Sequence, residues 1–308
     1  TTAFQKILAK NKKKLELNSL TYFPGGSNHT KFFYAFFQDI KSHHLYNRFE
    51  NAQKGTDYWQ EYIKQSINNA RGKFIIVSSE DLSLLKPSEV KNMKNFLLKD
   101  CNVDNIYVCI TLRNPFEYIN SFISQFVKAG FTKFSELASN SYPSFTLNGA
   151  DQNNYSAADL IYKIYFRFID SYITAFGMES IIWLDYREAR KKSIECLFFE
   201  KASQRIPHFP SIQFKKIRIS KYNSSLSLAA TLSLSMLNEL TPSPNSPPGV
   251  KKILRNIEGP KGNIASFTSS EYTSILNDWN YYLSLVGLPI EMLEYQNTSC
   301  FCMPDQND

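Results

Sequence analysis

The sequence predicts an α/β protein with a doubly wound, mostly parallel sheet flanked by helices. Short apolar runs such as residues 106–112 (IYVCITL) have the length and β-branched content of buried strands. Amphipathic segments such as residues 1–18 separate these runs, and strands that alternate with helices favour right-handed parallel crossovers. The chain has 308 residues, 43% of them hydrophobic, so it can bury a sizeable core.

The expected elements follow one another without an internal repeat, and we expect one domain over residues 1–308. Helices are expected at residues 1–18, 31–40, 57–72, 87–100, from 115 onward, 157–177, 224–240 and 269–287. Strands are expected at residues 19–24, 73–79, 106–112 and 179–186. Polar residues 131–156 are expected to be rich in loops, and residues 241–263, which begin with a proline-rich stretch, to form an irregular loop.

The net charge of +7 fits either a lysine-rich solvated surface or an anionic ligand. No helix-turn-helix, zinc-finger or RNP-like pattern points to nucleic acid, and no apolar run reaches the length of a membrane span. The odd cysteine count and the lack of framework spacing predict reduced thiols and a reducing, cytoplasmic compartment. These cysteines are Cys101, Cys109, Cys196, Cys300 and Cys302. The sequence is silent on the oligomeric state.

The strongest candidate site begins with Arg113, which follows the apolar run at 106–112. Open α/β sheets bind ligands at the carboxyl ends of their strands. Pro115 suits the first turn of the next helix, which would place Ser121 about two turns into it. A guanidinium fork and a hydroxyl that converge there could hold a phosphate. The alternative is a surface arginine paired with a nearby acid.

Two other strand ends carry polar residues. Gly25 and Gly26 follow the first strand and allow close backbone approach to a ligand. His29 in the same loop is either a general base near neutral pH or a solvated side chain. Glu80 follows the second strand, and it could be a base, an orienting partner of His29 or an acid favoured by a helix dipole.

Together these segments resemble sulfotransferases that use 3′-phosphoadenosine 5′-phosphosulfate (PAPS), especially bacterial enzymes that act on saccharides or other hydroxyl acceptors. The resemblance covers residues 1 to about 240 and rests on the order of the segments as much as on any one of them. The clearest segments are residues 22–33 (YFPGGSNHTKFF), 74–85 (FIIVSSEDLSLL) and 112–130 (LRNPFEYINSFISQFVKAG).

The resemblance implies a set of donor-binding residues. Thr1 and Thr2 resemble the last two threonines of the family's phosphosulfate loop and would bind the 5′-phosphosulfate. Arg113 and Ser121 would bind the 3′-phosphate. The Lys261–Gly262 pair faintly resembles the family's basic clamp over the nucleotide, although an ordinary surface turn has the same appearance.

The resemblance also implies a metal-free transfer of a sulfuryl group to a saccharide hydroxyl, with 3′,5′-adenosine bisphosphate as the product. His29 would take the acceptor proton, with Glu80 as the second candidate. In the family, a strand and a lysine-containing loop precede the two threonines, and we expect the natural chain to carry them before Thr1. One alternative is that the chain has been shortened. The other is that the protein has lost the loop, and such a protein would bind a nucleotide or anionic glycan with impaired catalysis.

Other nucleotide-dependent classes lack their sequence signatures. A P-loop kinase needs G-x-x-x-x-G-K-[ST], which does not occur in the chain. A metal-dependent glycosyltransferase would usually carry a DxD motif, and the only similar stretch, DQND, lies at the C-terminal tail.

Overall fold

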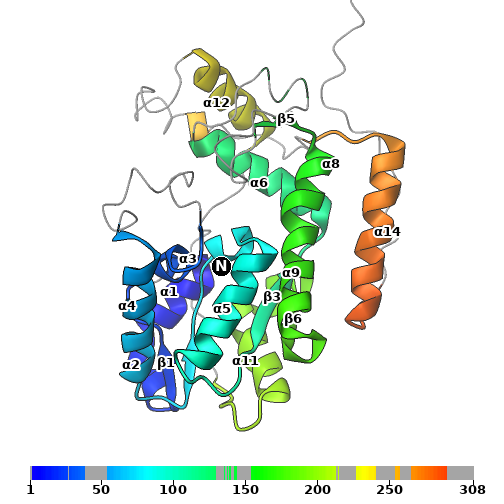
Figure 1. Cartoon of the computed structure of the whole chain (residues 1–308). Coiled ribbons are helices and arrows are strands. Elements are labelled where there is room, and N and C mark those ends of the chain that lie inside the picture. Colours follow the sequence, from blue (N-terminus) through cyan, green and yellow to red (C-terminus); the bar gives the residue numbers. More distant parts are fainter. Residues whose placement is uncertain are drawn as a thin grey trace, which may run out of the picture. The chain divides into compact units, whose positions relative to one another are not determined.

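The computed structural model describes residues 2–26, 28–38, 54–129, 135, 137, 139, 142–143, 154–212, 214, 227–240, 254–256 and 265–289. The chain divides into two compact units (Figure 1). The first comprises Thr1–Arg113 and Phe166–Tyr222, and the second comprises Asn114–Tyr165 and Asn223–Asp308. The single domain expected over residues 1–308 stays a prediction.

The first unit contains parallel strands and the helices that follow them. Its strands are β1 (Leu20–Tyr22), β2 (Phe74–Ile76), β3 (Val108–Leu112) and β6 (Ile181–Asp185). Its α-helices are α1 (Thr2–Lys10), α2 (Lys12–Glu16), α3 (Thr30–Tyr34), α4 (Thr56–Asn68), α5 (Pro87–Lys99), α9 (Arg167–Phe176), α10 (Tyr186–Lys192) and α11 (Ile194–Arg205). Short 3-10 helices lie at η3 (Asp81–Leu84) and η5 (Met178–Ser180).

The strands form two parallel pairs. β1 pairs with β2, with Leu20 opposite Phe74, and β3 pairs with β6, with Leu112 opposite Asp185. The predicted α/β class with parallel strands is therefore confirmed. Among the described residues the two pairs remain separate two-stranded sheets, so a continuous doubly wound sheet stays a prediction. The first strand is shorter than expected, in part because Pro24 cannot donate to a ladder.

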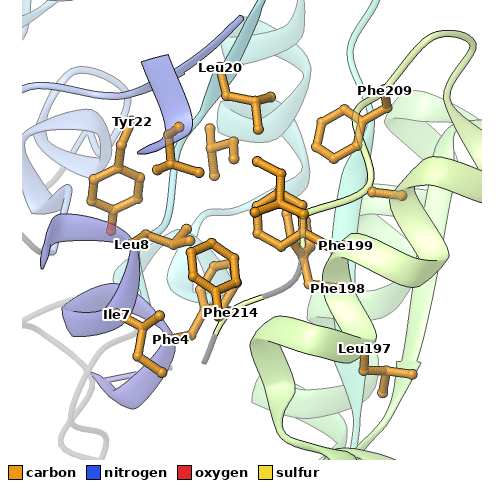
Figure 2. Packing of buried hydrophobic residues seen from close by; sticks show 14 of the residues in the cluster. Phe4, Ile7, Leu8, Leu20, Tyr22, Leu197, Phe198, Phe199, Phe209 and Phe214 are labelled. Carbon is orange, nitrogen blue, oxygen red and sulfur yellow. The ribbon is translucent and has the colours of Figure 1, made fainter. Parts of the chain in front are cut away.

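One apolar core holds the first unit together (Figure 2). Side chains alternate along each strand, so one face of β1 and one face of β6 point into this core. The rings of Phe4 in α1 and Phe198 in α11 meet edge to face with their centres 5.1 Å apart. Fully buried members of the core include Leu8, Leu15, Leu20 and Leu197. This core fixes α1 beside the parallel strands.

The second unit is mainly helical. Its elements are α6 (Pro115–Ala129), β4 (Tyr142–Pro143), β5 (Asn154–Tyr155), α8 (Ala157–Leu160), α12 (Leu228–Leu240) and α14 (Ser269–Leu285). The amide of Asn238 in α12 donates to the carbonyl of Val127 in α6 over 2.9 Å, which fixes these two helices together. The last helix is capped by Thr268, whose hydroxyl accepts from the backbone N–H of Glu271.

Two predicted helices differ from the structure. The helix expected at residues 31–40 is the single turn α3, which begins at Thr30 and ends at Tyr34. The helix expected at residues 157–177 ends as predicted before Gly177, which has a positive φ of 81°. Its middle part, η4 (Ile161–Phe166), is a π-helix between α8 and α9. Within the described ranges, no helix is both long and apolar enough to cross a membrane.

Candidate functional site

The loops that follow β1 and β2 are joined by a reciprocal pair of hydrogen bonds. The backbone N–H of His29 donates to the carbonyl of Ser78 over 3.0 Å, and the N–H of Ser78 donates to Nδ1 of His29 over 2.9 Å. Gly25 and Gly26 have φ values of 112° and 118°, a region that L side chains rarely adopt. The first loop can therefore turn back sharply to meet the second.

The first turns of α1 adjoin these loops. Nε2 of Gln5, a residue only 3% exposed, lies 3.3 Å from the carbonyl of Ser78 and 3.5 Å from Oδ1 of Asn28. The same core that packs α1 against β1 thus brings the beginning of this helix to the carboxyl ends of β1 and β2. Backbone N–H groups at a helix N-terminus favour anions.

His29 lies in the interior, at only 1% exposure, so its reading as a solvated loop residue is wrong. Its ring packs against the rings of Tyr22 and Phe23, with centres 4.5 and 5.4 Å away. Burial lowers the pKa of His29 to about 4, and the backbone of Phe23 and Gly26 opposes this shift only in part. His29 is therefore neutral at pH 7.

The tautomer of His29 follows from its contacts. Because Nδ1 accepts a hydrogen bond from the Ser78 amide, the neutral ring carries its own proton on Nε2. Nε2 is buried and has no hydrogen-bond partner among the described residues. To accept a proton from a substrate, His29 would have to release Ser78. This arrangement favours a structural role in joining the two loops.

Asp81 is the acid that sequence reasoning missed. Glu80 is exposed, whereas Asp81, the next residue, is half-buried, and its Oδ2 atom is out of contact with solvent and has no hydrogen-bond partner in the described structure. Burial raises the pKa of Asp81 to about 6. A hydrogen bond from the Thr30 hydroxyl opposes this shift, whereas the negative charge of Glu80 adds to it. Burial raises the pKa of Tyr34 to about 12, and the negative charge of Asp81 adds to this shift.

Arg113 lies directly after β3, at the end where the sequence predicted a ligand. Its guanidinium carbon lies 4.8 Å from the ring centre of Tyr186, the first residue of α10. β3 and β6 are neighbours in parallel register, so the ends of two adjacent strands supply the cation and the ring. A cation–π contact of this kind restrains the guanidinium.

Ser121 is half-buried in α6 of the second unit. The helix begins at Pro115 as predicted, and Oδ1 of Asn114 accepts from the backbone N–H groups of Phe116 and Glu117. Arg113 is the last residue of the first unit's opening segment, so the two predicted phosphate ligands belong to different units. Their convergence stays a prediction.

The other predicted donor ligands are only partly described. Thr2 begins α1, but its side chain is not described, and Thr1, Lys261 and Gly262 lie outside the described residues. Ala265 is the first described residue after the predicted clamp, Lys261–Gly262, in the sequence. Its N–H donates to Oδ1 of Asn120 over 3.1 Å. The chain that follows the clamp is thus attached to α6 next to Ser121.

Cys101, Cys109 and Cys196 are free thiols, as expected for the described cysteines, while Cys300 and Cys302 lie outside the described residues. No group of three or more His, Cys, Asp or Glu side chains in the described ranges could hold a metal ion.

Comparisons with known proteins add no assignment. No protein-family model, no curated protein and no solved structure matches this chain. Function is therefore inferred from the residues and their geometry, together with the sequence resemblance.

Proposed function

We propose that the protein is a sulfotransferase that moves a sulfuryl group from PAPS to a hydroxyl of a saccharide or related acceptor. The observation that carries this proposal is the chemistry at the carboxyl ends of the parallel strands. Asp81 follows the β1–β2 pair, and Arg113 and Tyr186 follow the β3–β6 pair. A carboxylate that accepts a proton and a cation that stabilises anionic oxygens would both assist metal-free sulfuryl transfer to a hydroxyl.

In this proposal Asp81 accepts the acceptor proton, in place of His29 or Glu80. Nδ1 of His29 is occupied by the Ser78 amide, and Glu80 is exposed to water. A carboxyl with a pKa of about 6 is mostly ionised at pH 7 and still accepts a proton readily. As the acceptor oxygen bonds to sulfur, the bond between sulfur and the phosphate oxygen breaks, and the acceptor proton passes to Asp81.

The cationic part of the site would bind the nucleotide. Arg113 would bind the 3′-phosphate, as the resemblance implies, and the N-terminus of α1 would receive the 5′-phosphate end with Thr1 and Thr2. The contact with Tyr186 supports the role of Arg113, since it restrains the guanidinium before a ligand arrives. In this proposal the protein orients PAPS and the acceptor, and PAPS supplies the activated sulfate.

Turnover with radiolabelled PAPS and a panel of saccharides tests the proposal. Asp81→Asn should lower turnover by roughly 10²- to 10⁴-fold, as expected for loss of a general base. Its affinity for 3′,5′-adenosine bisphosphate should stay within about twofold, because residues other than Asp81 bind the nucleotide. Asp100→Asn, at an exposed position that ends α5, is the matched control and should keep full turnover.

Two results would change the conclusion. Normal turnover in Asp81→Asn would return the base role to Glu80 or His29. If the unaltered protein binds 3′,5′-adenosine bisphosphate but transfers no label, the alternative function, a nucleotide or anionic glycan binder with impaired catalysis, is the better description.

A further inference from the structure

Arg167 is the first residue of α9, and one edge of its guanidinium is buried. The two nitrogen atoms of this edge, Nε and Nη2, are out of contact with solvent, and neither has a hydrogen-bond partner within the described structure. Burial lowers the pKa of Arg167, and the nearby charge of Glu89 opposes that shift. A buried cation is normally paired and hydrogen-bonded, so this edge lacks the partner that its environment demands.

Glu89 balances part of this charge but is committed to other contacts. It is fully buried at the start of α5, where Oε1 accepts from the backbone N–H of Gln38 over 2.8 Å and Oε2 accepts from that of Lys86 over 2.7 Å. These two bonds fix the carboxylate to the beginning of α5 and to the chain after α3. The open edge of Arg167 therefore needs an acceptor from another source.

The helix α9, which begins with Arg167, is attached to the turn that carries Asp81. The π-helix η4 ends directly before Arg167, and short π-helical segments are frequent at functional sites. Five residues further along α9, the hydroxyl of Tyr172 donates to the carbonyl of Leu82 over 3.0 Å. Leu82 is the neighbour of Asp81 in η3, so α9 is attached to the turn that carries the proposed base.

We infer that the Nε–Nη2 edge of Arg167 binds an oxyanion of the acceptor, so that the acceptor is an acidic saccharide bearing a carboxylate or a sulfate ester. The N–H groups of this edge point the same way and match the two oxygens of such a group. The side chain as a whole is half-buried, so a change in its outer rotamers brings the edge to a ligand. This inference rests on the proposed function, because it places the acceptor beside Asp81.

Calorimetric titrations test the inference without turnover. The probes are a tetrasaccharide that contains glucuronate, its carboxyl-reduced form, a sulfated form of that reduced tetrasaccharide, and 3′,5′-adenosine bisphosphate. The unaltered protein should bind an acidic form at least tenfold more tightly than the reduced, unsulfated one. Arg167→Lys, which keeps the charge but loses the paired edge, should remove that preference and keep the nucleotide affinity. Arg190→Lys, at an exposed position in α10, is the matched control.

The outcomes separate the inference from the proposed function. If the unaltered protein does not prefer either acidic form, the inference is overturned. This result does not depend on whether Arg167→Lys folds. The nucleotide titration then still tests the proposed function. If Arg167→Lys loses nucleotide affinity instead, the oxyanion is a donor phosphate and the inference is overturned. A preference for an acidic form that depends on Arg167, in a protein without nucleotide binding, would sustain the oxyanion site and refute the sulfotransferase.

Discussion

Replacing Asp81 with Asn should stabilise the protein at neutral pH while it reduces activity. The folded-state pKa of Asp81 is about 6, compared with 3.8 for the ordinary carboxyl. Because the folded pKa is the higher of the two, the proton is bound more tightly in the folded state. The associated stability is fully present below about pH 4 and is lost as the pH rises through about 6.

The size of this effect follows from the shift. Each pKa unit corresponds to about 1.4 kcal/mol, so a shift of about two units sets an upper limit of about 3 kcal/mol. Since Asp81 is half-buried and water screens part of its charge, we expect about 1 to 2 kcal/mol. An asparagine at this position has no charge to bury and can still accept from the Thr30 hydroxyl.

Urea unfolding of the unaltered protein and of Asp81→Asn, at pH 7.5 and at pH 4, measures the difference. The variant should be the more stable protein at pH 7.5, and the two free energies of unfolding should converge at pH 4. Asp100→Asn controls for the removal of an exposed carboxylate. A variant that is less stable at pH 7.5, or a difference that does not change with pH, would refute the reasoning about the Asp81 environment.

Three further predictions follow from other residues. Arg113→Ala should weaken the binding of 3′,5′-adenosine bisphosphate by about 1.5 to 3 kcal/mol, and unchanged calorimetric affinity would contradict its assignment. An NMR titration of His29 should show no protonation between pH 8 and pH 5.5, because burial lowers its pKa to about 4, and a midpoint near 6.5 would contradict the buried position. Leu8→Ala should lower the free energy of unfolding by about 2 to 5 kcal/mol, since Leu8 is 0% exposed in the core, and a loss below 1 kcal/mol would contradict that packing.

Helix boundaries set by local chemistry were predictable from the sequence. Pro115 begins α6 and Gly177 follows the last turn of α9, because a missing N–H and a positive φ are properties of these residue types themselves. The parallel pairing of β3 with β6 also agrees with the alternation of strands and helices. The π-helix η4 carries no comparable signal, since its hydrogen-bond pattern depends on tertiary packing.

The candidate site was predictable only to the level of the strand ends. His29 lies in the expected loop, but its burial depends on the rings of Tyr22 and Phe23, which periodicity cannot orient. Glu80 and Asp81 are neighbours after the same strand, and only the packing of the turn decides that the second acid is the half-buried one. Arg167 was not singled out because arginines on amphipathic helices are usually solvated.

The bond between the Ser78 amide and the His29 ring has a consequence for how this protein can vary. It ties the lengths of two surface segments to each other, because a residue added between Pro24 and His29 would draw the imidazole away from the amide. A related protein that gains or loses a residue in the first segment should therefore change the second as well, or replace the histidine with a side chain that does not need the amide.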